Sequence, residues 1–178
     1  GSVNVDKLPF FDIDYIFIFL RAKSIGENVR VKLVCNNMVG EEKCGNTFTT
    51  NMNIERCEVV KSDEAEDDIK LDGDKGVKMK YPTYAQMKRI EASGIDEKIN
   101  VIVNCIDAIY DSKGIYPSKD YTKEQLKEFV EGLTQNNFNK LENFVDNFPT
   151  FAVTLEETCG KCGFHHMVRY TDFYDFFT

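Results

Sequence analysis

The sequence predicts an α+β fold in which a zinc-ribbon-like pair of β-hairpins, carrying four cysteines, closes a mainly helical insertion. Four of the six cysteines fall into two pairs flanked by strand-like segments, and helical periodicity fills the chain between them. With 178 residues, 42% of them hydrophobic, a single domain at 1–178 is expected. Its expected parts are a buried helix at 10–26, zinc-ribbon hairpins at 27–60 and 150–172, an acidic loop and hairpin at 61–82, and a helical insertion of about four helices at 83–149.

The first element is an apolar helix. Asp12 or Asp14 can cap a helix over residues 15–24, with Gly26 ending it. The run Tyr15-Ile-Phe-Ile-Phe-Leu20 makes the helix apolar nearly all round, so we expect it to be buried in the protein or under a partner. This run is far shorter than the roughly 20 residues that a bilayer requires, and no membrane partner is expected.

Two pairs of cysteines provide the candidate metal ligands. Cys159-Gly-Lys-Cys162-Gly163 is a knuckle in which glycine lets the turn tighten after the second cysteine, and Cys44 is likewise followed by glycine. No secretory signal pattern is visible, so a reducing compartment is expected, where grouped cysteines more often hold metal than form disulfides. The predicted ligands of a tetrahedral structural Zn²⁺ are Cys35, Cys44, Cys159 and Cys162.

Alternating apolar and polar residues place each pair at the tip of a β-hairpin. The predicted strands are 29–34 with 47–54, and 151–155 with 165–170. The alternative is two independent free or redox-active thiol pairs. Cys105 is expected to be a buried core thiol and Cys57 a semi-buried thiol, and neither is expected to be a ligand. His165 or His166 could replace a cysteine as a ligand, but we expect both to be exposed strand residues.

An acidic segment follows the first hairpin. Residues 62–74 hold seven acidic residues and one lysine, a local charge of −6. A calcium-binding EF-hand loop starting at Asp68 would place Lys70 and Met79 at ligand positions, so that template fails. We interpret the run as a solvated loop, with Asp72-Gly73 turning a hairpin between 69–71 and 77–80.

Capping signals and apolar spacing predict four helices in the insertion. Thr83 with Gln86 and Thr122 with Gln125 are capping boxes, and Thr134 can cap a further helix. The remaining helix is predicted from isoleucines spaced on one helical face. The expected inward residues are Ile95, Ile99, Ile102, Ile106, Ile109, Leu126, Phe129, Val130, Leu133, Phe138, Leu141, Val145 and Phe148.

The sequence carries no recognisable catalytic set. Phosphate-binding glycine loops and the Gly-x-Ser-x-Gly elbow are absent, and the two histidines are adjacent. A four-cysteine zinc site has no open coordination position, so no enzyme activity is expected. The 30 acidic and 22 basic residues give a net charge of −8, which disfavours nucleic acid. A zinc-ribbon nucleic-acid or transcription module is nevertheless the alternative function.

Several segments resemble, in order, one viral family. They are Phe11-Asp-Ile-Asp-Tyr-Ile-Phe, Leu20-Arg-Ala-Lys-Ser-Ile-Gly-Glu27, Val77-Lys-Met-Lys-Tyr-Pro82, Val130-Glu-Gly-Leu-Thr-Gln-Asn-Asn-Phe138, Phe148-Pro149 and the Cys159 knuckle. Together they resemble the baseplate hub and hub-assembly proteins of T-even-type contractile-tailed phages. The family commonly has a tight first cysteine pair, which residues 36–43 interrupt here.

The resemblance implies a structural or assembly-assisting protein that contacts other phage baseplate or hub proteins. It places the protein in the tail baseplate of the virion, or in the host cytoplasm during assembly, and leaves its oligomeric state open. No catalytic residue is implied. The candidate contact surfaces are the helix at 15–20 and the aromatic tail at 173–177, with ordinary core packing as the alternative for each.

Overall fold

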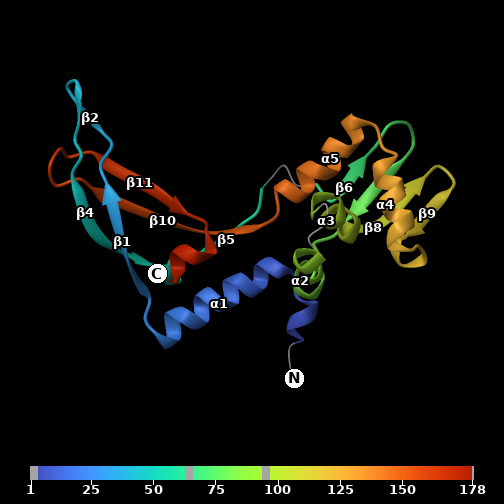
Figure 1. The fold of residues 1–178 in the computed structure, drawn as a ribbon, viewed down its shortest axis with the longest axis horizontal. Helices are drawn as coiled ribbons and strands as arrows, with labels where there is room; N and C mark the ends of the chain where they lie inside the picture. Colours follow the sequence, from blue (N-terminus) through green and yellow to red (C-terminus); the bar gives the residue numbers. More distant parts are fainter. Residues whose placement is uncertain (1–3, 63–65, 94–96, 178) are drawn as a thin grey trace. The chain divides into compact units, whose positions relative to one another are not determined.

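The computed structural model describes residues 4–62, 66–93 and 97–177 and shows a mixed α/β fold with small antiparallel sheets (Figure 1). The chain divides into two compact units, Gly1–Ile13 with Lys61–Pro149, and Asp14–Val60 with Thr150–Thr178. We call them the inserted unit and the hairpin unit. The five α-helices of the described residues are α1 (Phe10–Ser24), α2 (Tyr84–Ser93), α3 (Glu97–Cys105), α4 (Lys123–Glu131) and α5 (Gln135–Asp146). The single-domain organisation predicted from length stays a prediction.

The hairpin unit contains both predicted cysteine hairpins. Strand β1 (Asn28–Val34) pairs antiparallel with β4 (Thr47–Asn53), and β10 (Thr150–Thr158) pairs with β11 (His165–Tyr170). Strand β5 (Glu58–Val60) joins the other edge of β10. Alternate side chains of the strands share one apolar cluster, as a pleated strand with one buried face requires. Its buried members are Ile18, Ala22, Val29, Leu33, Met52, Ile54, Cys57, Phe151, Val153, Leu155 and Phe176.

Helix α1 differs from its prediction at its start and in its burial. It begins at Phe10, before either predicted aspartate cap, because Phe10 and Phe11 pack their rings against Phe148 and Tyr81. The predicted end is correct, since the chain leaves the helix at Gly26 with a φ of 133°.

Only one face of α1 is buried within the protein, and burial of the other face under a partner stays a prediction. Ile18 and Ala22 are buried, whereas Phe17 and Leu20 are 49% and 59% exposed. Ile16 and Phe19 are exposed as well. Because α1 is apolar nearly all round and packs on one side, its other side exposes apolar side chains.

In its described residues, the inserted unit combines helices α2 to α5 with an antiparallel sheet. The predicted hairpin is present as β6 (Asp68–Lys70) and β7 (Gly76–Met79), with Gly73 at a φ of 78° in the turn. Strands β8 (Ile106–Asp111) and β9 (Gly114–Pro117) extend it to a sheet of order β6-β7-β8-β9. The insertion is therefore less helical than predicted.

The second predicted helix, with inward isoleucines from Ile95 to Ile109, is shorter in the structure than predicted. Helix α3 ends at Cys105 and the chain continues directly into β8, so Ile106 and Ile109 lie on a strand. Pairing explains the change: Ile109 lies opposite Val77 on β7, and the N–H of Lys80 donates to the carbonyl of Cys105. Ile95, also predicted on this face, lies outside the described residues.

The three threonine caps predicted in the inserted unit are confirmed. Thr83 and Gln86 exchange capping hydrogen bonds at α2, Thr122 and Gln125 form a capping box at α4, and the Thr134 side chain accepts the N–H of Asn137 at α5. Phe144, which was not among the predicted inward residues, is 1% exposed and stacks on Tyr81. The buried cluster of this unit comprises Ile69, Leu71, Val77, Met79, Ile90, Val101, Ile102, Val103, Cys105, Ile106, Leu126, Val130, Leu141 and Phe144.

Truncation of a buried isoleucine tests this core. We expect Ile102→Ala, at a site with 0% exposure, to lower the free energy of unfolding by about 2–5 kcal/mol. The matched change Ile115→Ala, at a site 64% exposed, should alter it by less than about 0.5 kcal/mol. Urea unfolding followed by circular dichroism measures both, and equal losses would contradict the assignment of the core.

Candidate metal centre

Four sulfur atoms from the two hairpin tips meet in one cluster. Cys35 and Cys44 come from the tip of the β1–β4 hairpin, and Cys159 and Cys162 from the tip of the β10–β11 hairpin. Their Sγ atoms all lie within 4.8 Å of one another. The Sγ atoms of Cys35 and Cys162 are 3.6 Å apart, and those of Cys44 and Cys159 are 3.9 Å apart. A tetrahedral ion with metal–sulfur bonds of about 2.3 Å requires sulfur–sulfur distances of about 3.8 Å, so the cluster has the right size.

The second hairpin holds its cysteines in a tight knuckle. Gly163 follows the second cysteine of this hairpin and has a φ of 73°, a backbone conformation that residues other than glycine rarely adopt. The N–H of Gly163 donates to the carbonyl of Cys159 at 2.8 Å, and the N–H of Cys159 donates to the carbonyl of Phe164 at 2.8 Å. These bonds turn the chain so that both thiols project to the same side.

The first hairpin repeats this knuckle despite its longer spacing. The N–H of Gly45 donates to the carbonyl of Cys35 at 3.0 Å, and the N–H of Cys35 donates to the carbonyl of Asn46 at 2.8 Å. Gly45, like Gly163, has a positive φ, here 63°. The two hairpins therefore present their cysteines through the same pair of backbone hydrogen bonds.

A small inserted hairpin accounts for the extra residues of the first knuckle. Strands β2 (Met38–Val39) and β3 (Glu42–Lys43) pair with each other, and the N–H of Cys44 donates to the carbonyl of Asn37 at 2.8 Å. This closes the neck of the insertion next to Cys44. Without residues 38–43 the segment would read Cys35-Asn-Asn-Cys44-Gly45, which has the Cys-x-x-Cys-Gly form of the second knuckle.

Polar groups from both hairpins surround the sulfur atoms. The side-chain amides of Asn37 and Asn46 approach the Sγ atoms of Cys162 and Cys159, at 3.7 Å and 3.4 Å. The Lys161 ammonium donates to the carbonyl of Cys44 at 2.9 Å, which brings a positive charge beside the thiols. Sequence reasoning missed the two asparagines, although each stands two residues after a cysteine of the first pair.

The protein environment acts differently on the individual thiols. Burial raises the pKa of Cys35 to about 12. Burial also raises the pKa of Cys159, but hydrogen bonds from the backbone N–H of Cys162 and from Asn46 outweigh it and bring that pKa to about 6. N–H donors directed at sulfur stabilise thiolate, the form in which cysteine binds metal.

The other candidate ligands lie apart from the cluster. Burial raises the pKa of Cys57 to about 11 and of Cys105 to about 12. Cys105 is a buried thiol as predicted, whereas Cys57, predicted to be semi-buried, is buried as well. His165 is exposed near Glu156, and the half-buried His166 packs its ring against Phe48 and Phe164. Among the described residues, the four cysteines form the one group of at least three Cys, His, Asp or Glu side chains able to share a metal ion.

Fold and site together define a mixed α/β protein with a four-thiol cluster capable of holding one metal ion. The chain belongs to the family described as T4 bacteriophage base plate protein, which matches residues 2–178. This confirms the resemblance to T-even-type phage baseplate proteins. Comparison with curated proteins and with solved structures gave no match. In the described part of the chain, no helix has the length and apolar character needed to cross a membrane.

Deleting the inserted hairpin tests the equivalence of the two knuckles. We expect removal of residues 38–43, joining Asn37 to Cys44, to leave metal binding intact because the bonds that shape the knuckle lie outside the deletion. Titration with Co²⁺, followed by its thiolate absorption bands, measures the number of ions bound. The control is Gly45→Val, which places a β-branched residue at a φ of 63° and should weaken binding. Loss of the bands in the deletion variant would contradict the equivalence.

Proposed function

We propose that the protein is a structural or assembly-assisting component of the baseplate hub of a contractile-tailed phage. It works through contacts with other baseplate proteins, contains a structural zinc ion and is not an enzyme. The family match over residues 2–178 is the observation that carries this proposal. Its place is then the tail baseplate of the virion, or the host cytoplasm during assembly.

The donor set supports zinc as the bound ion. Four thiolates in a tetrahedral arrangement are typical of structural Zn²⁺ sites, and all four positions are taken by protein. Cys35, Cys44 and Cys159 are buried, and Cys162 is partly exposed. The centre would therefore stabilise the fold and leave no coordination position for a substrate.

Metal analysis tests the zinc ion. The full chain purified without chelator should contain about one zinc ion per molecule, and Cys44→Ala should retain less than about half of that, because three thiols form an incomplete site. The matched control Cys105→Ala removes a buried thiol outside the cluster and should keep the zinc. Chelation should lower the melting temperature of the unaltered chain. Four fast-reacting thiols in metal-free native protein would instead favour redox-active pairs.

The exposed face of α1 supports a role in protein contacts. Ile16, Phe17 and Leu20 lie within about one turn and a half of helix, and each is at least 41% exposed. Apolar exposure in this density is typical of protein interaction sites. In the aromatic tail, Phe176 belongs to the apolar cluster of the hairpin unit, whereas Tyr174 and Phe177 are exposed. We therefore place the main contact on α1.

Co-sedimentation with the other baseplate proteins of the same phage tests this contact. The unaltered chain should associate with at least one of them, and Leu20→Glu should weaken that association about tenfold or more because it buries a charge in an apolar interface. Ile115→Glu introduces the same charge at an exposed site in the inserted unit and should have no effect. A chain that binds none of these proteins contradicts the proposal. Salt-dependent retention on DNA or RNA would favour the nucleic-acid module instead.

A further inference from the structure

A divalent metal ion held by four thiolates leaves an excess of negative charge where the two hairpin tips meet. Cys35, Cys44 and Cys159 are buried there, and a buried charge is costly unless hydrogen-bond donors surround it. The groups that donate to the sulfur atoms, or bring positive charge close to them, therefore affect how tightly the centre binds its ion.

Two side-chain amides reach the sulfur atoms from the opposite hairpin. The amide nitrogen of Asn46 lies 3.4 Å from the Sγ atom of Cys159, and that of Asn37 lies 3.7 Å from the Sγ atom of Cys162. A thiolate only accepts hydrogen bonds, so the nitrogen of each amide must face it. The two pairs are 113 and 125 positions apart in sequence, so both contacts form only when the hairpins have docked.

The donors divide unequally between the two pairs of cysteines. In the second hairpin, the backbone N–H of Cys162 donates to the sulfur of Cys159. The corresponding N–H of the first hairpin, that of Cys44, donates to the carbonyl of Asn37 instead, at 2.8 Å. The insertion of residues 38–43 between Asn37 and Cys44 creates this difference. Among the described residues, the asparagine amides that approach sulfur likewise serve the second pair.

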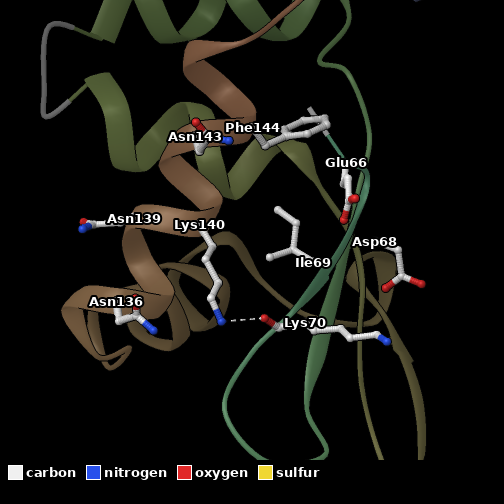
Figure 2. A pocket seen from close by; sticks show the side chains of 9 residues that line it. All are labelled: Glu66, Asp68, Ile69, Lys70, Asn136, Asn139, Lys140, Asn143 and Phe144. Atoms are coloured by element: carbon white, nitrogen blue, oxygen red, sulfur yellow. Dashed lines mark hydrogen bonds between the residues drawn. The ribbon is translucent and has the colours of Figure 1, made fainter. Parts of the chain in front are cut away.

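A lysine links the two tips in the other direction. The Lys161 ammonium of the second hairpin donates to the carbonyl of Cys44 at 2.9 Å, which brings a positive charge to the centre. The inserted unit contains a contact of the same kind, in which the Lys140 ammonium donates to the carbonyl of Lys70 at 2.9 Å, as the dashed line in Figure 2 marks. This contact offers a matched control, because the four clustered thiols all belong to the hairpin unit.

We propose that Asn37, Asn46 and Lys161 are positioning residues of the metal centre, each acting on it from the opposite hairpin. The two asparagines supply N–H donors to the second pair of thiolates, and the lysine offsets part of the negative charge. Metal binding and the docking of the two hairpins therefore strengthen each other. The inference rests on the zinc centre proposed above and assigns the residues that determine how tightly it holds its ion.

Replacing these side chains measures their contributions to metal affinity. Asn46→Leu and Asn37→Leu keep the size of the side chain but remove the donor, and each should weaken Co²⁺ binding by the full chain about tenfold or more, measured by competition with a chelator. Asn36→Leu makes the same change at an exposed residue and should stay within about twofold of the unaltered chain. Lys161→Met should weaken binding about fivefold, whereas Lys140→Met should not change it.

The spectrum of the Co²⁺-loaded chain separates hydrogen bonding from packing. An N–H directed at sulfur stabilises the sulfur electrons from which the thiolate-to-cobalt absorption bands arise. Loss of that N–H in Asn46→Leu should therefore shift these bands to longer wavelength, and Asn36→Leu should leave them in place. Weaker binding without a shift would assign Asn46 to packing alone and overturn the proposal.

The remaining outcomes distinguish this inference from the zinc centre itself. Asn37→Leu keeps the test decisive if Asn46→Leu does not fold. Affinities and bands equal to those of the unaltered chain overturn the role of the asparagines while the zinc centre stands, and equal losses in Lys161→Met and Lys140→Met overturn the role of the lysine. An unaltered chain that binds neither Co²⁺ nor Zn²⁺ overturns the zinc centre and this inference together.

Discussion

The meeting of two hairpin tips at the four thiols is the constraint on which the hairpin unit depends. That unit consists of Asp14–Val60 and Thr150–Thr178, two stretches separated in sequence by most of the inserted unit. Cys44 and Cys159, whose sulfur atoms are 3.9 Å apart, are 115 positions apart in the chain. A metal ion bound to these thiols would stabilise the folded state by its binding free energy, because the unfolded chain has no preformed site.

Contacts away from the thiols also hold the two hairpins together. Strand β5 pairs with β10, and the Thr50 hydroxyl donates to the Glu157 carboxylate between the two hairpins. Below the tips, Leu33 and Met52 of the first hairpin share an apolar cluster with Val153 and Leu155 of the second. The apolar contacts bring the hairpins together at their bases, so the thiols at the tips need little further ordering to meet. A metal bound there would stabilise an arrangement that the apolar cluster already favours.

Local signals in the sequence predicted the elements whose stabilising contacts are also local. The caps at Thr83, Thr122 and Thr134 depend on residues three positions apart, and the cysteine hairpins follow from alternation within each strand. The isoleucines at 102, 106 and 109 suit a helical face equally well, and only the pairing of β8 with β7 and β9 decides for a strand after Cys105. Likewise, the early start of α1 depends on ring contacts with Tyr81 and Phe148, residues distant in sequence.

In the candidate metal site, too, the sequence predicted the residues but not the contacts between distant parts of the chain. All four cysteines could be selected from pairing and glycine spacing, but the interrupted first pair concealed a knuckle equivalent to the second. Residues 38–43 separate Asn37 from Cys44 in sequence, and the hydrogen bond between these two residues restores the knuckle. The knuckle tolerates the insertion because the β2–β3 hairpin brings Cys44 back next to Asn37. Asn37 and Asn46 lie beside sulfur atoms of the other hairpin because both flank the neck of the insertion, where the tips meet.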